Sequence, residues 1–155
     1  MPKNGKYFFK TYVCLISFQN GQSLIEFALV LPVLLLILLG ALDLGRVSNT
    51  YVGITNASRE GARYGASYPT DTPGIQLRTR QEAAGAGVTI TNANIVIQCF
   101  PYVGGSPYAS CSDAYKGDRI QVSVNFNFDF FSLYLLRMPN FPLSTSTTMA
   151  LINGK

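Results

Sequence analysis

Histidine is absent from the 155-residue chain. Its absence excludes Ser-His-Asp and Cys-His catalysis and removes the side chain that most often binds metals. The sequence also shows no nucleophile paired with a base, no metal-ligand spacing and no glycine-rich phosphate loop. We therefore expect no catalytic residue, no metal site and no cofactor, and we do not expect an enzyme.

Charged residues are few, at 13% of the chain, and the net charge is only +4. The basic residues are scattered along the sequence rather than gathered in one stretch. The sequence therefore predicts no nucleic-acid partner. The length allows a membrane segment and one folded domain of modest size, and not two domains.

Cysteine occurs three times, at Cys14, Cys99 and Cys111. Cys14 precedes the apolar segment described below, whereas the other two lie close together far downstream. In a domain outside the cytoplasm such a pair indicates a disulfide. Closing so short a loop contributes on the order of 3 kcal/mol to stability. Two buried free thiols are the alternative.

One long apolar run lies near the N-terminus. Residues 27–42 contain no charge, and the wider segment 23–44 is charged only at Glu26 and Asp43, near its two ends. A bilayer core of about 30 Å needs about 20 helical residues, so the length fits one crossing. Apolar residues occur all round this helix, unlike the surface helix of a soluble protein. A cleaved signal peptide is the alternative, but residues 43–48 form a poor cleavage site.

The basic residues on either side of this run predict its orientation. Lys3, Lys6 and Lys10 precede it without any acidic residue, whereas only Arg46, close to Asp43, follows it directly. The positive-inside rule then places the N-terminus in the cytoplasm. We expect a single-pass protein of the bacterial cytoplasmic membrane, in contact with lipid, whose C-terminal domain lies outside the cytoplasm.

Glu26 is unusual at the start of an apolar run. A charged side chain deep in lipid costs about 2.5–3.5 kcal/mol on insertion scales. Glu26 therefore either lies at the wet interface or serves a function, and both explanations are open. Gly21 followed by the sequence QSLIEF resembles the processing site of type IV pilin-like proteins. In that family a membrane-embedded peptidase cuts after the glycine on the cytoplasmic side, and glutamate is the fifth residue of the mature chain.

By that resemblance, cleavage makes Gln22 the new N-terminus and Glu26 the fifth residue. The new α-amine is cationic below its pKa of about 7.7–8.0. The carboxylate of a neighbouring subunit can pair with this amine, which removes two unpaired charges from a low-dielectric environment. The pair would also set the axial register of an assembly.

The resemblance is closer still to the TadE-like proteins of tight-adherence pilus systems. Their N-terminal signature combines this start with an apolar run that contains Pro, a D-x-G-R segment and a T-N-A-x-R-E-G-A-R-Y stretch. The matching residues here are 21–27, Pro32, 43–46 and 55–64. The positions that the resemblance singles out on the helix are Asp43, Arg46, Asn56, Arg59, Glu60, Gly61 and Arg63.

This resemblance implies a minor pilin-like (pseudopilin) membrane subunit for assembly of a tight-adherence type pilus or related secretion apparatus. It implies three kinds of protein partner: a prepilin-type peptidase, other pilin-like subunits and the pilus assembly machinery. The alternative is a single-pass membrane-anchored extracytoplasmic binding domain that does not polymerise.

Residues 46–66 are expected to continue the same helix beyond the membrane. An apolar stripe is predicted at Val47, Tyr51 and Ile54. Small residues then recur at four-residue spacing, at Ala57, Gly61 and Gly65. Such a row lets another backbone approach closely, either in the chain's own sheet or in a neighbouring subunit.

Two ion pairs are expected on this helix at i, i+3 spacing, Asp43 with Arg46 and Glu60 with Arg63. We interpret both as ordinary surface pairs, each worth a few tenths of a kcal/mol.

The remainder of the chain predicts a small α+β domain. The expected elements are a loop at 68–74, a helix at 75–84 and strands at 94–100, 120–130 and 143–151. Apolar and polar residues alternate throughout 120–130, which is typical of a half-buried antiparallel strand. The apolar segment 130–136 is either core or a surface that faces the membrane or a partner.

The predicted fold class is therefore α+β, with a long N-terminal helix packed on a small antiparallel sheet. The membrane-spanning half of this helix precedes its exported half. The expected division is a cytoplasmic leader at 1–21, a transmembrane and extended helix at 22–66, and an extracytoplasmic domain at 67–155.

Overall fold

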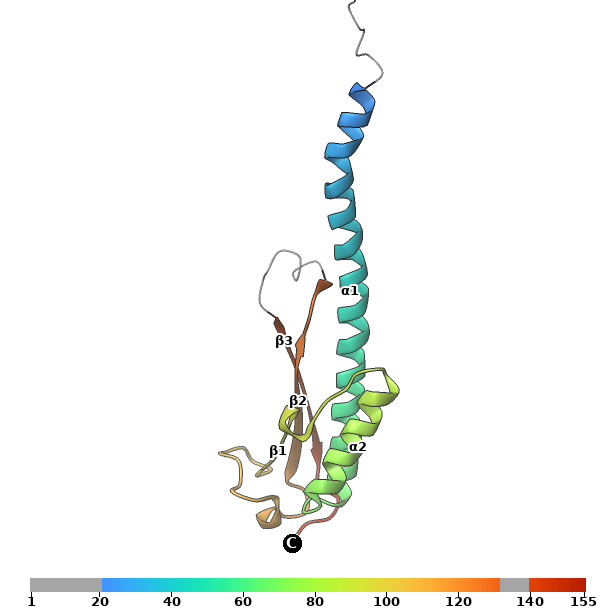
Figure 1. Ribbon diagram of the computed structural model, residues 1–155. Helices are drawn as coiled ribbons and strands as arrows, with labels where there is room; N and C mark the ends of the chain where they lie inside the picture. Colours follow the sequence, from blue (N-terminus) through green and yellow to red (C-terminus); the bar gives the residue numbers. More distant parts are fainter. Residues whose placement is uncertain (1–20, 132–139) are drawn as a thin grey trace, which may run out of the picture. The chain divides into compact units, whose positions relative to one another are not determined.

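The computed structural model describes residues 21–131 and 140–155. The chain divides into two compact units, Met1–Leu36 and Ile37–Lys155, and each is described by itself. The described helices and strands follow in the order α1 (Gln22–Ser67), α2 (Thr72–Gly85), η2 (Asn92–Asn94), β1 (Ile95–Phe100), η3 (Cys111–Asp113), β2 (Arg119–Phe128) and β3 (Phe141–Ala150). This α+β arrangement confirms the predicted fold class (Figure 1).

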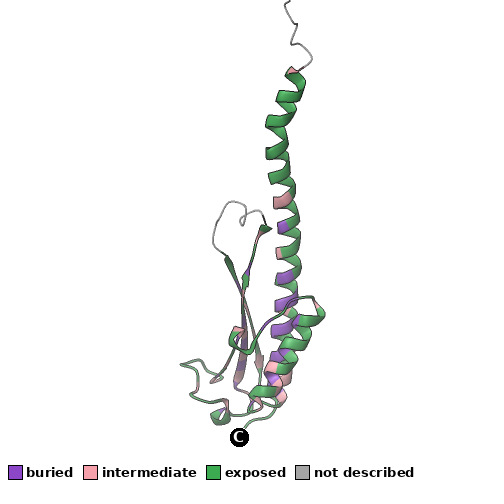
Figure 2. Cartoon of the chain, viewed as in Figure 1, coloured by how far each residue is buried: buried purple, intermediate pink, exposed green. Residues whose placement is uncertain are grey.

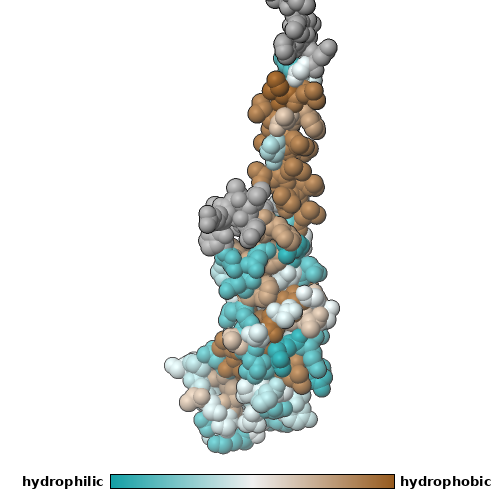
Figure 3. Space-filling view, viewed as in Figure 1, coloured by the Kyte–Doolittle hydropathy of each residue, from teal (hydrophilic) through white to brown (hydrophobic). Residues whose placement is uncertain are grey.

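Helix α1 begins at Gln22 and includes Pro32, so the long helix predicted from the sequence is confirmed. Its first half carries exposed apolar side chains on all sides. Figure 3 shows one face of this half, where these side chains are brown. Within the described part of the chain, α1 is the one helix long and apolar enough to cross a membrane. Its buried residues begin only at Asp43 (Figure 2).

The three strands form one antiparallel sheet in the order β1-β2-β3, with β2 in the centre. In this register Val122 lies between Ile97 of β1 and Thr147 of β3. The predicted alternation holds along β2, because Ile120, Val122 and Val124 are buried while the residues between them reach the other face. The prediction placed β2 correctly but ended it at 130 instead of Phe128.

The second half of α1 packs on the buried face of this sheet, within the unit Ile37–Lys155. Ser58 Oγ donates to the backbone oxygen of Val122 at 2.8 Å, which fixes the helix to the central strand. A Cβ atom at Gly61 would meet Thr79 Oγ1 and lie 3.3 Å from Val122 Cγ1. The small residues of α1 therefore contact the chain's own sheet and α2. Of the two predicted uses of this row, contact with the chain's own sheet or with a neighbouring subunit, the structure shows the first.

Tyr51 departs from the predicted apolar stripe, because it is 49% exposed. The buried face of α1 instead runs through smaller residues: Thr50, Gly53, Ile54, Ala57, Ser58, Gly61, Ala62, Gly65 and Ala66. A strand can approach a helix closely only where side chains are small, so tyrosine lies outside this contact.

Helix α2 begins at Thr72, and the prediction that residues 68–74 form a loop is wrong for its last three residues. Asp71 caps the helix, since its Oδ1 accepts from the backbone N–H of Gly74 at 3.0 Å. A proline in the first turn is compatible with this start, because its missing N–H needs no partner there. The helix ends at Gly85, and Gly87 then adopts φ of 77°.

The predicted apolar segment 130–136 falls largely outside the described residues. Phe130 is half-buried against the core, whereas Phe131 is exposed. Cys14 and the rest of the predicted leader before Gly21 also lie outside the described residues.

Candidate functional site on helix α1

Helix α1 begins at the residue that follows Gly21. The backbone N–H of Ile25 donates to Gly21 O at 3.2 Å, so the first turn starts at this glycine. Gln22 Nε2 donates to Glu26 Oε1 at 3.2 Å, and Glu26 is exposed on the helix surface. The structure thus brings together the three residues predicted for cleavage and assembly. Among described residues, Gln22 supplies the one side-chain hydrogen bond recorded for Glu26.

Asp43 lies where the apolar run ends and is 1% exposed. Its Oδ1 accepts from the backbone N–H of Phe131 at 3.2 Å and from Arg46 Nη1 at 3.1 Å. The interpretation of Asp43 and Arg46 as an ordinary surface pair is therefore wrong for the carboxylate. The sequence could not show this, because Phe131 is far away along the chain.

Arg46 lies against the aromatic residues at the end of β2. Its guanidinium carbon is 5.1 Å from the ring centre of Phe128 and 4.4 Å from that of Phe131. These are cation–π distances. Together Asp43 and Arg46 join the end of the apolar run to the β2 end of the sheet. At Phe128 the end of β2 thus contacts helix α1.

The stretch 55–64 presents two different faces. Its buried face contains Ala57, Ser58, Gly61 and Ala62, which contact the sheet or α2 or lie in the core. The predicted site residue Gly61 therefore serves packing within the domain. This role explains why a glycine stands in the middle of a helix, where it otherwise costs up to about 1 kcal/mol relative to alanine.

The opposite face exposes Asn56, Arg59 and Arg63. These residues follow i, i+3, i+7 spacing and so share one side of the helix. Among the described residues no ion pair or side-chain hydrogen bond is recorded for Asn56 or Arg59. This face of α1, called the basic face below, is exposed. Among the described residues Arg59 is its one cation without an ion pair, because Arg63 pairs with Glu60.

Glu60 and Arg63 form the predicted exposed pair. Arg63 Nη2 lies 2.7 Å from Glu60 Oε1, and Arg63 Nε donates to Oε2 at 2.8 Å. The hydrogen bond from Arg63 lowers the pKa of Glu60, and the same bond raises the pKa of Arg63. This pair lies on the surface, where solvent screens its contribution to stability.

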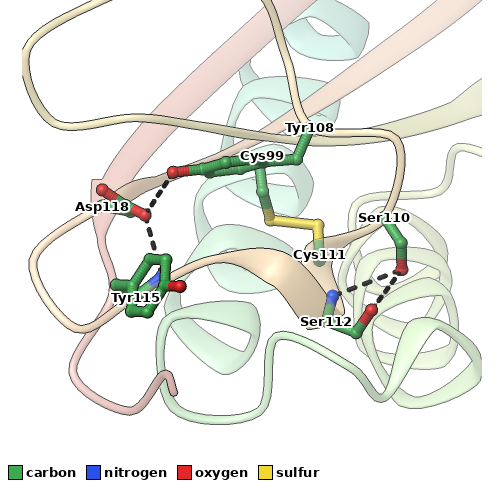
Figure 4. The surroundings of a disulfide bond; sticks show 7 residues. All are labelled: Cys99, Tyr108, Ser110, Cys111, Ser112, Tyr115 and Asp118. Carbon is green, nitrogen blue, oxygen red and sulfur yellow. Dashed lines mark hydrogen bonds between the residues drawn. A yellow bond between two sulfur atoms is a disulfide. The ribbon is translucent and has the colours of Figure 1, made fainter.

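Cys99 and Cys111 form a disulfide with a Cα–Cα distance of 5.2 Å (Figure 4). The bond links β1 to η3, and Cys99 is fully buried. The prediction of a disulfide is confirmed, and the alternative of two free thiols is wrong.

Asp118 organises the connection around this disulfide, and sequence reasoning missed it. Its carboxylate accepts from Tyr115 N at 2.8 Å, Tyr108 Oη at 2.8 Å and Tyr102 N at 2.9 Å (Figure 4 shows the first two). The bond from Tyr115 is the largest cause that lowers the pKa of Asp118, with partial opposition from burial. The available signal was the Gly-Asp pair directly before a strand, which favours a turn stabilised by the aspartate.

A second carboxylate joins α1 to α2. Tyr64 Oη donates to Asp71 Oδ2 at 2.8 Å, and Asp71 also caps α2. The bond from Tyr64 is the main cause that lowers the pKa of Asp71, and it raises the pKa of Tyr64. Asp71 and Asp118 therefore hold elements in place and show no arrangement of a catalytic pair.

The described residues contain no group of three or more Cys, Asp or Glu side chains that could hold a metal ion. The fold and these contacts define a class of protein: an N-terminal apolar helix that could anchor the chain in a membrane, continued into a disulfide-bonded α+β domain. Residues 21–63 match the model of the TadE-like protein family. No curated protein and no solved structure matches the chain significantly.

Proposed function

We propose that this chain is a minor pilin-like subunit for assembly of a tight-adherence type pilus or a related secretion apparatus. The observation that carries the proposal is the start of α1 at Gln22, with Glu26 exposed one turn later inside the segment that matches the TadE-like family. A peptidase of the prepilin type would cut after Gly21, on the cytoplasmic side. The mature protein would then be helical from its first residue.

In this mechanism the α-amine of Gln22 in one subunit pairs with Glu26 of the next. In the uncut chain Glu26 contacts the side-chain amide of Gln22, at 3.2 Å, which is a neutral partner. Cleavage supplies a cation at the same helix end. This pair favours association because neither charge is then left unpaired in a low-dielectric environment. The favourable free energy therefore arises only when subunits lie side by side.

The basic face of α1 is proposed as a second contact for assembly. Asn56, Arg59 and Arg63 remain exposed after the small residues of the same helix have packed on the sheet. They suit an acidic surface on a neighbouring subunit or on the assembly machinery. The predicted orientation, based on Lys3, Lys6 and Lys10 before the apolar run, places this face outside the cytoplasm.

The test is the variant Glu26→Gln, which removes the charge and keeps the length and hydrogen-bonding capacity of the side chain. Removing one partner of a buried pair costs about 3–5 kcal/mol. We therefore expect the amount of the chain found with other pilin-like subunits to fall at least about tenfold. Its amount in the membrane should stay unchanged, because the apolar run is intact.

The matched control is Glu82→Gln, which removes an exposed glutamate on α2. This variant should associate with the other subunits as the wild type does. Normal association of Glu26→Gln would overturn the assembly mechanism and favour a membrane-anchored binding domain that does not polymerise.

One observation favours that second function. A pocket of about 360 Å³ lies beside the disulfide, and Gln76, Gln98 and Ser110 are among the residues that line it. Its described lining is uncharged and rich in amides and hydroxyls. Such a surface could bind a neutral polar ligand, and a domain with that role would tolerate Glu26→Gln.

A further inference from the structure

The hydrogen bond to Asp43 fixes one end of the sheet beside the end of the apolar run. Asp43 follows directly after residues 27–42, and Leu42 and Leu44 on either side of it are 60% and 67% exposed. Its carboxylate accepts from the backbone N–H of Phe131 at 3.2 Å. The residues that end β2 therefore lie at the level where α1 would leave a bilayer. Figure 1 shows the arrowhead of β2 beside the middle of α1.

Two aromatic side chains are exposed at this end of the sheet. Phe131 is 64% exposed and Phe141 is 54% exposed. Phe130 packs edge-on to the Phe141 ring at 6.2 Å and to the Phe128 ring at 5.0 Å, so the exposed Phe141 ring is supported by two further aromatic rings. These exposed rings, Phe131 and Phe141, are called the aromatic tip below.

The charged groups beside the aromatic tip suit a membrane surface. The guanidinium of Arg46 lies 4.4 Å from the Phe131 ring centre and is three residues beyond Asp43. Three helical residues rise about 4.5 Å, which places Arg46 at headgroup depth just outside the hydrocarbon. The carboxylate of Asp43 is kept from lipid by Phe131 and Arg46. A second carboxylate, Asp129, lies between Phe128 and Phe130 and is exposed, so it would face the wet headgroup region.

We propose that the aromatic tip, Phe131 and Phe141, lies in the outer interface of the bilayer that α1 crosses, with Arg46 among the lipid headgroups. The inference rests on the proposed membrane anchorage of α1. Aromatic rings gather at the headgroup level of membrane proteins, where an apolar ring meets a wet boundary. The contact would hold the domain at the membrane surface until the subunit leaves the bilayer, because assembly must withdraw the tip from lipid.

The test uses the full chain in vesicles of phosphatidylethanolamine and phosphatidylglycerol that carry brominated lipid, which quenches tryptophan on contact. The chain contains no tryptophan, so each substitution introduces a single probe. Phe131→Trp and Phe141→Trp report on the aromatic tip. Both positions are exposed, and tryptophan retains the aromatic contact with Arg46 or Phe130. Circular dichroism checks that each variant folds.

The matched control is Tyr102→Trp, at an exposed residue beside Asp118 at the opposite end of the sheet. That end is about 30 Å from the tip, since β2 contains 10 residues at about 3.4 Å each. We expect tryptophan at 131 and 141 to emit at shorter wavelength and to be quenched several-fold more than tryptophan at 102. Bromine near the headgroups should quench more than bromine deep in the chains.

A third probe, Leu35→Trp in the apolar run, separates this inference from the anchorage on which it rests. If tryptophan at 35 is strongly quenched while tryptophan at 131 and 141 is quenched no more than tryptophan at 102, the lipid contact alone is overturned. A neighbouring subunit would then be the occupant of the aromatic tip. Absence of quenching at 35 would overturn both the anchorage and the tip contact.

Discussion

Single glycines in this domain differ in what surrounds them. A Cβ atom at Gly61 would meet the hydroxyl of Thr79, which is fully buried and donates to Ile75 O at 2.8 Å. Thr79 therefore cannot turn away without loss of a buried hydrogen bond. Gly85, at the end of α2, has nothing within 4 Å of the same position. The helical period predicted that Gly61 faces a backbone, but not that its neighbour is α2 as well as the sheet.

Gly61→Ala should destabilise the domain by about 1–3 kcal/mol, because a methyl group enters a filled space. Gly85→Ala is the control and should leave stability unchanged or raise it slightly, since alanine is the better helix former. Guanidinium unfolding of the detergent-solubilised full chain, followed by circular dichroism, measures both. Equal midpoints for the two variants would contradict close contact between α1 and α2.

At the scale of the element, regular segments were predictable from the sequence and the connections were not. Strand β2 follows from strict alternation, and α1 follows from a long apolar run joined to small residues at helical spacing. The start of α2 was missed because Asp71 and the residues after it are typical of a loop as well as of a capped helix. The burial of Asp43 depends on Phe131 and could not be derived from local pattern.

The connection from β1 to β2 should be sensitive to acid through Asp118. Three donors keep the pKa of this carboxyl below that of an unfolded aspartate, which is about 3.9. The stability it provides is fully present above about pH 4 and is lost as the pH falls through the folded-state value, because the unfolded chain takes up the proton first. Asp118→Asn should lower the thermal midpoint at pH 7, and its difference from the wild type should shrink at pH 3.

Asp113→Asn is the control for this experiment, because the Asp113 carboxylate is exposed and forms an exposed pair with Lys155 at 3.7 Å. It should change the midpoint little at either pH. A difference between Asp118→Asn and the wild type that stays constant from pH 7 to pH 3 would show that the charge of Asp118 does not stabilise the connection.

At the scale of the whole molecule, one helix serves two environments. The first half of α1 is apolar on every side, whereas its second half packs small residues on a sheet and exposes a basic face. The sequence predicted the apolar first half and the row of small residues in the second half, because both carry strong compositional or periodic signals. It left open whether that row packs on the chain's own sheet, and it did not predict the basic face. It also predicted Glu26 as an assembly residue, which stays a prediction, since its proposed partner belongs to another subunit.

The most direct test of the account is the N-terminal sequence of the mature protein, taken from membranes of its own host. We predict a chain that starts at Gln22, the first residue of α1, with Glu26 in fifth position. Such a start would establish processing of the pilin type and make the amine of Gln22 available for pairing. A chain that retains residues 1–21, in cells whose peptidase is active, would contradict the account and leave an uncleaved membrane anchor.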